Sequence, residues 1–201
     1  MSELALKVPS KTAQVVLSKA IPLFAKSGYE GVSMRDIAGA VGISGAALYH
    51  HYPNKQSLYL AAMAYAFEDK AIGITTDLDA PGTAIQRLER FVAHFTDLIA
   101  RDPDFRALLQ RELLDGDDAR LKLLADQVFM VPFQAMTTLA KELAPDCDPH
   151  LLAISMVGLV LFHFETAPVR RFLPGKSAKH NDPKLIAKHV THLLTMAFGP
   201  G

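Results

Sequence analysis

Residues 33–52 read SMRDIAGAVGISGAALYHHY, a stretch with the signals for two short helices joined by a tight turn. Ser33 and Asp36 have the S-x-x-D spacing of a capping box, which predicts that a helix begins at the next residue after Ser33. Gly42 can adopt the left-handed conformation that ends a helix, and Ser44 is placed to cap a second one. The pattern predicts a helix-turn-helix, a motif whose second helix enters the major groove of DNA.

The apolar residues of this stretch recur at helical spacing and predict an inner face. The first helix is expected to turn Ile37, Ala38 and Val41 inward, with the small Ala38 at the point where the helices cross. Ala47 and Leu48 are expected to be the inward residues of the second helix. The rest of the second helix is then left for another role.

The second helix and its end carry four ring-bearing side chains in a row. Tyr49 and His50 are expected to point outward, where a hydroxyl and an imidazole can donate hydrogen bonds to phosphate oxygens. Tyr52 is expected to turn back and seal the core. His51 fits either a DNA contact or a solvated surface position.

Three further positions favour contact with DNA. Gly45 and Ala46 are small enough to let the backbone approach a groove wall or a thymine methyl group. Lys55 stands at the start of the next helix, where the helix dipole disfavours a cation and a bound phosphate would reverse the effect. The alternative for Lys55 is an exposed lysine that tolerates a small penalty.

Four segments in about residues 10–60 resemble the DNA-binding domain of TetR-family (tetracycline-repressor-like) regulators: AIPLF (20–24), GYEG (28–31), SMRDIAGAVGIS (33–44) and LYHHYPNK (48–55). The resemblance implies a homodimer that binds a palindromic operator in double-stranded DNA. It also implies a helical C-terminal half that dimerises and often binds a small-molecule inducer. By matching positions, it assigns DNA contacts to Ser33, Ser44, Gly45, Ala46, Tyr49, His50, His51 and Lys55.

Within that set, the resemblance implies that Tyr49 and Lys55 anchor phosphates, whereas Gly45, Ala46 and His50 lie nearest the bases. The sequence departs from the family pattern in two places. Ala46 stands where a glycine is common in the family. Pro22 stands at a position that an ordinary helical residue usually occupies.

The composition is that of a globular chain, with 201 residues, 50% hydrophobic and 21% charged. Its single cysteine excludes an internal disulfide and suits a cytoplasmic protein. The N-terminus has no apolar segment of the kind that directs secretion, so no secretion signal is expected. The longest apolar run, residues 151–162, is shorter than the ~20 residues that span a bilayer, so no membrane association is expected. The net charge is zero, but residues 1–60 hold six Lys and Arg against three acidic residues, a modest excess for a partner of DNA.

Helical patterns fill the chain, which predicts an all-α fold of about nine helices. Three Asp-Pro pairs, at 102–103, 148–149 and 182–183, predict helix starts. Residues 73–82, GITTDLDAPG, are expected to form a joint, and Pro22 and Pro132 to bend or shorten their helices. The expected helices cover about 10–27, 34–40, 45–51, 54–72, 83–100, 103–115, 118–143, 149–166 and 183–198.

Two domains are expected. Residues 1–60 would form the helix-turn-helix domain, with the helix from residue 54 bridging to a ligand-binding and dimerisation domain over 61–201. Methionine and aromatic residues of this second part suit an adaptable cavity for a small apolar or amphipathic ligand, although the same residues fill ordinary cores. The candidates are Phe91, His94, Phe95, Met130, Phe133, Gln134, Thr137, Met156, Phe162 and His163.

The helix over 149–166 is apolar almost all round, so it must be covered on both sides. Gly158 in its middle is best explained by close approach of another helix. This helix and the last one are expected to form a four-helix interface between two chains. The interface candidates are Ala153, Val157, Gly158, Leu161, Ile186, Val190, Leu193, Leu194 and Ala197.

No catalytic or metal-binding motif is recognised, so no enzyme activity, metal or cofactor is expected. The sequence therefore predicts a DNA-binding repressor that a small ligand releases. Two alternatives remain open. One is a ligand-free DNA binder controlled by a protein partner, and the other is a helical small-molecule-binding protein or enzyme with a vestigial DNA-binding head.

Overall fold

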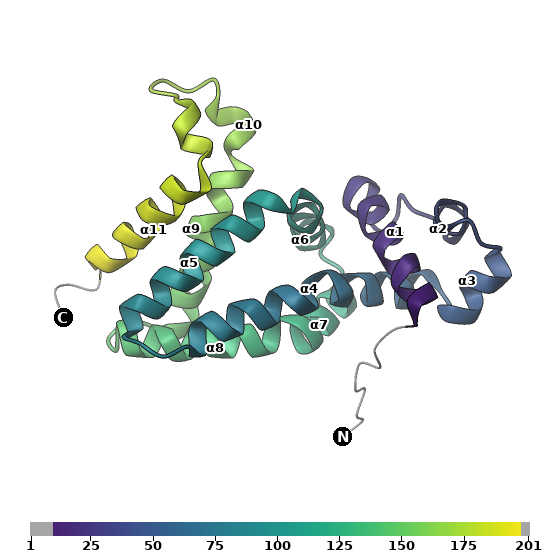
Figure 1. Cartoon of the computed structure of the whole chain (residues 1–201), viewed down its shortest axis with the longest axis horizontal. Helices are drawn as coiled ribbons and strands as arrows, with labels where there is room; N and C mark the ends of the chain where they lie inside the picture. The colour runs from purple at the N-terminus through teal and green to yellow at the C-terminus, as the bar shows by residue number, and fades with distance from the viewer. Residues whose placement is uncertain (1–9, 198–201) are drawn as a thin grey trace. The chain divides into compact units, whose positions relative to one another are not determined.

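The computed structural model describes residues 10–197, which form helices and no strands (Figure 1). The expected all-α fold is therefore confirmed. The chain divides into two compact units. The first contains the described residues up to Glu68 together with Asp104–Val128, so it extends beyond the three N-terminal helices. The second contains Asp69–Pro103 and the described residues from Phe129 onward.

The first unit begins with α1 (Lys11–Ser27), α2 (Met34–Val41) and α3 (Gly45–His51), which pack in sequence order. It also contains the first part of α4 (Lys55–Asp79), most of α6 (Pro103–Asp115) and α7 (Asp118–Leu124). Its core is made of apolar side chains with almost no exposure: Val16, Phe24, Ile37, Leu48, Leu58, Tyr59 and Leu108.

Helix α1 begins and ends where the sequence predicts. The amide of Ala13 donates to the hydroxyl of Ser10, and Gly28 ends the helix with φ 71°. The helix continues through Pro22 to its last residue, so this proline does not end it early.

The expected joint over residues 73–82 is wrong, because α4 continues to Asp79. Gly73 is not a helix breaker here. A Cβ at this position would lie 2.6 Å from Cε1 of His94, so the glycine makes room for a neighbouring helix. Leu78 is buried, which fixes the last turn of α4 in the second unit. The chain turns only afterwards, at the Pro and Gly of positions 81 and 82.

The single helix expected over 118–143 is interrupted. After α7, residues Ala125–Phe129 form a π-helix, η1, and α8 covers Met130–Leu143. Pro132 gives a physical reason, because it has no amide to bond the carbonyl of Val128, and its ring clashes with that carbonyl in a regular α-helix. The proline therefore lies in the first turn of α8, where its ring is tolerated.

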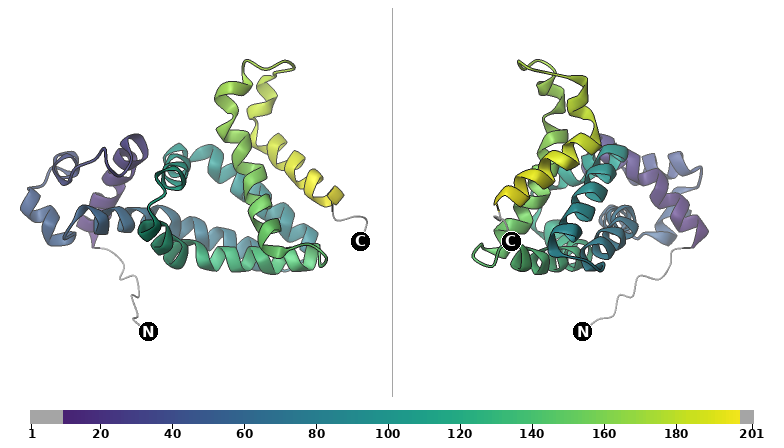
Figure 2. Two further views of the ribbon diagram at one scale, coloured as in Figure 1. Left: turned by 180° about the vertical axis from the view of Figure 1, so that it is seen from behind. Right: turned by 60° about the vertical axis from the view of Figure 1, so that its left-hand side comes forward.

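The second unit is built from the end of α4, α5 (Ala84–Arg101), α8, α9 (Pro149–Glu165), α10 (Ala167–Arg170) and α11 (Pro183–Ala197). Helix α11 lies along α5 and also packs on α9, while α8 packs on both α5 and α9 (Figure 2). The three Asp-Pro pairs start α6, α9 and α11 as predicted. The short α10 and the 3-10 turn η2 (Ala178–Asn181) were not predicted, since each is a single turn. Within the described range, no helix is long and apolar enough to cross a membrane.

Candidate nucleic-acid interface and effector region

The start of α2 is fixed by the predicted capping box. The amide of Asp36 donates to Ser33 Oγ at 3.2 Å, and the amide of Ser33 donates to Asp36 Oδ2 at 2.9 Å. The Ser33 hydroxyl also donates to Asp36 Oδ2, at 2.6 Å. These bonds from Ser33 lower the pKa of Asp36. The carboxylate thus stays charged at the positive end of the helix, and α2 begins at a fixed residue.

The turn between α2 and α3 depends on Gly42. This residue has φ 79° and ψ 30°, the left-handed conformation predicted for it, and its amide donates to the carbonyl of Ala38 at 2.9 Å. Ser44 then caps α3 by accepting the amide of Ala47 at 3.2 Å. Two hydroxyl caps and one left-handed glycine set the direction of α3.

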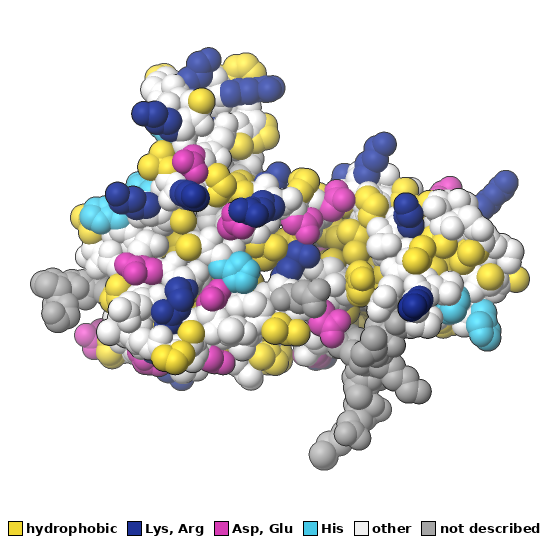
Figure 3. Space-filling model, viewed as in Figure 1, with side chains coloured by type: hydrophobic (Ala, Val, Ile, Leu, Met, Phe, Trp, Pro, Cys, Tyr) yellow, Lys and Arg dark blue, Asp and Glu magenta, His cyan; other side chains and the backbone are white. Residues whose placement is uncertain are grey.

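Helix α3 buries a single side chain, Leu48. Tyr49 is 52% exposed, and His50 and His51 are exposed beside each other, with ring centroids 5.8 Å apart. Histidine side chains appear in cyan on α3 in Figure 3. Tyr52 is only half-buried, and this burial raises its pKa.

One expectation for α3 is wrong. Ala47 was expected to face inward, but it is exposed together with Gly45 and Ala46. Helix α3 has only seven residues and contacts the core through Leu48 alone. The side chains of its first turn are therefore exposed to solvent. The outer surface of α3 therefore begins with three small residues and continues with Tyr49 and the two histidines. Ala47 is the member of this surface that sequence reasoning missed.

Lys55 is held by contacts within the chain. Its ammonium donates to the carbonyl oxygen of Tyr29 at 3.0 Å, lies 4.3 Å from the centroid of the Tyr29 ring and lies 3.6 Å from Glu30 Oε2. Glu30 is largely exposed, so this ion pair is weak in water. The contacts place the charge of Lys55 beside the turn between α1 and α2.

A buried polar cluster lies behind that turn. Glu112 of α6 and Arg120 of α7 have exposed fractions of 1% and 7%, and Arg120 Nε donates to Glu112 Oε1 at 3.0 Å. Tyr59 of α4 donates its hydroxyl to the other carboxylate oxygen, and burial followed by this bond raises the pKa of Tyr59. The guanidinium carbon of Arg120 lies 4.4 Å from the Tyr29 ring centroid. In sequence, Glu112 and Arg120 look like surface charges, and no local signal distinguishes them.

Arg111 of α6 contacts the end of α1. Its Nε donates to the carbonyl of Ala25 at 2.7 Å and its Nη2 to the carbonyl of Lys26 at 2.6 Å. The last carbonyls of a helix have no partner within that helix, so Arg111 satisfies two of them. Through Arg111 and the Glu112 cluster, α6 and α7 form one packed body with the three N-terminal helices.

The ligand-pocket candidates of the second unit divide into interior and surface residues. Phe91, Phe95 and Met156 are buried, and the rings of Phe91 and Phe95 stack at 5.7 Å. Phe133, Thr137, His94 and His163 are half-buried. Gln134, Met130 and Phe162 are exposed, and Phe162 is 66% exposed.

Three of these candidates have specific neighbours. His94 Nδ1 lies 2.5 Å from Asp77 Oδ2 of α4. The Phe133 ring meets His150 edge to face, and His163 lies edge to face with His189 of α11. Burial, then the charges of His189 and Arg170, lower the pKa of His163. Within the described residues, no group of three or more His, Cys, Asp or Glu could hold a metal ion.

Thr96 of α5 was not predicted as a site residue. It is fully buried at 0% exposure, and its Oγ1 has no hydrogen-bond partner among the described residues. A buried polar atom without a partner costs about 1–3 kcal/mol. Because Thr96 follows Phe95 on a helix that packs against α8, α9 and α11, its hydroxyl is an unused polar group in an apolar interior.

The dimer candidates also divide. Ala153, Ile186, Val190 and Leu194 are buried within one chain, where α5, α9 and α11 pack together, so they cannot form an outer surface. Val157 and Leu161 are half-buried, whereas Gly158, Leu193 and Ala197 are exposed. The exposed large apolar side chains of these two helices are Leu151, Ile154, Phe162, Leu185, Leu193 and Met196. The sequence could not decide which face is inside, because α9 is apolar on both.

A helix-turn-helix with an exposed second helix is the arrangement by which one class of DNA-binding proteins places a helix in the major groove. Residues 16–62 match the family model described as bacterial regulatory proteins, tetR family. Residues 16–62 are therefore a TetR-family DNA-binding domain, and the resemblance seen in the sequence is confirmed.

Two curated relatives are similar to the N-terminal part. The HTH-type transcriptional regulator YezE of Bacillus subtilis is 32% identical over 90 residues, 45% of this chain and 46% of that protein. The negative transcriptional regulator of the biofilm operon icaADBC, IcaR of Staphylococcus epidermidis, is 38% identical over 52 residues, 26% of this chain and 28% of that protein. The chain thus aligns with less than half the length of these relatives.

Solved structures share the whole fold. A tetR-family regulatory protein from Rhodococcus RHA1 has a TM-score of 0.75 at 24% identity and covers 96% of this chain and 100% of that one. AibR in complex with isovaleryl coenzyme A and operator DNA has a TM-score of 0.72 at 23% identity, covering 95% and 100%. FadR from Bacillus subtilis in complex with stearoyl-CoA has a TM-score of 0.75 at 16% identity, covering 90% and 97%. At these identities, the likeness establishes the fold.

Proposed function

We propose that this protein is a homodimeric transcriptional repressor that binds a palindromic operator and is released by an acyl-CoA thioester. The observation that carries the proposal is the outer surface of α3, where Gly45, Ala46 and Ala47 leave the backbone accessible and Tyr49 and His50 stand outward. Side chains of this size and polarity suit a helix in a major groove. The repression is inferred from IcaR, which is named a negative regulator.

The DNA contacts fall into two groups. Tyr49 and Lys55, with Ser33 and Ser44 at helix starts, are proposed to contact phosphates, which set position without reading sequence. Gly45, Ala46, Ala47 and the histidines of α3 are proposed to lie at the base edges. Lys55 would exchange its contact with Glu30 for a phosphate, since the Glu30 side chain of that ion pair is largely exposed.

The proposed domains are a DNA-binding part ending near residue 60 and a ligand-binding and dimerisation part beyond it. The dimer surface is proposed to consist of the exposed apolar side chains of α9 and α11 around Gly158. Two copies would hold their α3 helices about one helical turn of DNA apart.

The effector class is inferred from the structural relatives that bind isovaleryl coenzyme A and stearoyl-CoA. An acyl-CoA is amphipathic, which agrees with the ligand expected from sequence. The apolar interior around Phe91, Phe95 and Met156 would take the acyl chain. The unpaired hydroxyl of Thr96 would donate to the thioester oxygen. Ligand binding between these helices would favour a dimer whose α3 helices no longer match the operator.

The test is a mobility-shift titration of the full-length chain against the DNA upstream of its own gene. Binding should weaken steeply with salt, because phosphate contacts release counterions. Lys55→Ala should weaken binding to all sequences and reduce the salt slope by about 1. Lys141→Ala, an equal charge change on an exposed residue of α8, is the control. Gly45→Leu should instead change which sequences bind.

The outcomes separate the competing functions. Release of bound DNA by isovaleryl-CoA or stearoyl-CoA supports the effector class, and DNA binding indifferent to both favours control by a protein partner. A monomer that ignores double-stranded DNA at low salt overturns the proposal and favours a vestigial DNA-binding head. Equal effects of Lys55→Ala and Lys141→Ala would remove Lys55 from the phosphate contacts.

A further inference from the structure

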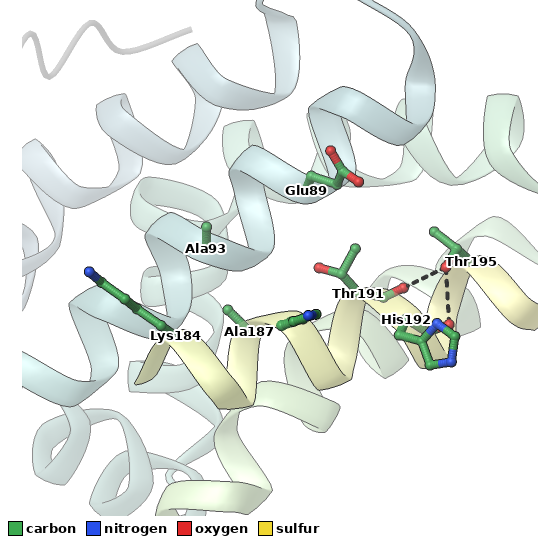
Figure 4. Close-up of a pocket in the computed structure, with 8 residues that line it drawn as sticks. Glu89, Ala93, Lys184, Ala187, Thr191, His192 and Thr195 are labelled. Atoms are coloured by element: carbon green, nitrogen blue, oxygen red, sulfur yellow. Dashed lines mark hydrogen bonds between the residues drawn. The ribbon is translucent and has the colours of Figure 1, made fainter. Parts of the chain in front are cut away.

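A groove between α5 and α11 in the second unit has no part in the proposed function. Its volume is about 450 Å³, and its walls come from these two helices alone (Figure 4). Sites for small molecules have volumes of roughly 300–1,000 Å³, so the groove is large enough for a metabolite. It lies on the exposed side of α5, at Glu89 and Ala93, whereas Phe91 and Phe95 are buried.

The α11 wall carries a row of basic side chains. Lys184, Lys188 and His192 follow one another at intervals of four residues, line the groove and are exposed. Within residues 10–197, neither lysine forms an ion pair. Like charges at this spacing destabilise a helix slightly. A bound anion would convert that repulsion into attraction.

The remaining groups give the groove its depth and one hydrogen-bond donor. Ala93 and Ala187 face it from opposite helices, and their small side chains leave the space open (Figure 4). Thr195 Oγ1 is bonded to the carbonyl oxygens of Thr191 and His192, at 3.0 Å each. The half-buried hydroxyl of Thr191 is the one that a ligand can use.

Glu89 is the single acidic side chain that lines the groove, and it stands on the α5 wall. It repels anionic groups towards α11 and accepts hydrogen bonds from hydroxyl groups. The two lysines are attached about 6 Å apart along the helix axis, and their flexible side chains can converge on neighbouring phosphates. The groove therefore has a cationic wall and a wall that accepts hydrogen bonds.

We infer that the groove binds a diphosphate carried by a small hydroxylated molecule, such as a nucleoside diphosphate. Lys184 and Lys188 contact the phosphates, Thr191 donates a hydrogen bond, and Glu89 accepts from sugar hydroxyls. Free diphosphate offers the same anionic chemistry without the hydroxyls, so it binds more weakly. The site is separate from the proposed effector interior, whose aromatic residues lie on the buried side of α5.

The inference is tested by calorimetric titration of the full-length protein with ADP, sodium pyrophosphate and adenosine at constant ionic strength. ADP should bind more tightly than pyrophosphate, and adenosine should not bind measurably. The double variant Lys184→Ala/Lys188→Ala should weaken ADP binding by at least about tenfold, since it removes two charge-assisted contacts. Lys176→Ala/Lys179→Ala removes the same charge from exposed residues outside the groove and should leave the affinity within about twofold.

A second variant tests the opposite wall. Glu89→Gln should strengthen pyrophosphate binding, because a repelling charge is lost, and reduce the preference for ADP over pyrophosphate. Glu165→Gln, at an exposed residue of α9, is the control. Circular dichroism establishes that each variant is folded. The inference is overturned if neither anion binds, if adenosine binds as tightly as ADP, or if the groove variants behave like their controls.

Discussion

The hydroxyl of Tyr59 donates a hydrogen bond of 2.6 Å to Oε2 of Glu112, although the two residues are 53 positions apart. Arg120 bonds the other carboxylate oxygen, so the charge of Glu112 is balanced inside the first unit. The three residues join α4, α6 and α7, and Tyr29 lies against Arg120 and Tyr59. The N-terminal helices are thus tied to α6 and α7 through a polar cluster.

Arg120→Ala is expected to lower the free energy of unfolding by about 3–5 kcal/mol, because it leaves a buried carboxylate without its cation. The control is Arg101→Ala, since Arg101 is exposed and pairs with Asp97 one helical turn away. That variant should change the unfolding free energy by no more than about 0.5 kcal/mol. Urea denaturation measures both, and equal losses would show that burial of the cluster is unimportant for stability.

Two glycines of the helix-turn-helix should respond to alanine with opposite signs. Gly42→Ala places a side chain at φ 79° and should destabilise the protein by about 1–2 kcal/mol. Gly39→Ala lies within α2, where a Cβ meets no atom within 4 Å, and should stabilise by up to about 1 kcal/mol. Thermal unfolding of both variants checks the pair. A stabilising Gly42→Ala would contradict the role of the left-handed turn.

The helix-turn-helix could be predicted from sequence because its signals are local. Ser33, Asp36, Gly42 and Ser44 act within three residues of the helix ends they define. The wrong position of Ala47 has a different cause. Helical periodicity predicts two buried residues in α3. The number that are buried depends on how much of this short helix contacts its neighbours, and only Leu48 is buried.

The other features of the fold depend on contacts between residues that are distant in the sequence. From the sequence alone, Gly73 suggests the end of a helix. The structure shows instead that the ring of His94 lies against this glycine. Ile186 and Val190 are as apolar as Leu185 and Leu193, so only packing on α5 and α9 decides which are buried. The partnership of Glu112 with Tyr59 and Arg120 requires three helices to meet. No periodicity in the sequence records such contacts.

The unpaired hydroxyl of Thr96 predicts different effects on stability and on ligand binding. Thr96→Val keeps the shape and removes a buried polar atom without a partner, so the unfolding free energy should stay the same or rise by about 1 kcal/mol. The shift in melting temperature caused by isovaleryl-CoA should become smaller. Thr138→Val, at an exposed residue of α8, is the control. An undiminished thermal shift in Thr96→Val would show that the hydroxyl does not contact the ligand.

His163 is expected to make stability depend on pH. Burial and the nearby charges of His189 and Arg170 lower its pKa, so the unfolded chain binds a proton more readily than the folded one. Its stabilising contribution is therefore complete above the ordinary pKa of 6.5 and is lost as the pH falls below that value.

Urea denaturation at pH 7.5 and 5.5 measures this effect. The difference in unfolding free energy between the two pH values should be smaller in His163→Gln than in the wild-type protein. His51→Gln, at an exposed histidine of α3, should retain the wild-type difference. If His163→Gln also retains it, another group is responsible for the loss at low pH.

Substitution of Gly158 should have different effects on the stability of a single chain and on the proposed dimer. A Cβ at this position meets no atom within 4 Å, so the single chain gives no reason for glycine in the middle of α9. In an isolated chain, alanine there should add up to about 1 kcal/mol to the unfolding free energy. In the proposed dimer, glycine is explained if a second copy packs closely on the exposed apolar side chains of α9 and α11. Gly158→Leu should accordingly raise the dimer dissociation constant by at least about tenfold, a change of roughly 1.4 kcal/mol.

Sedimentation over a range of protein concentrations measures this dissociation constant. Thr138→Leu, at an exposed residue of α8, is the control. An unchanged dissociation constant in Gly158→Leu would place the dimer surface elsewhere on the molecule.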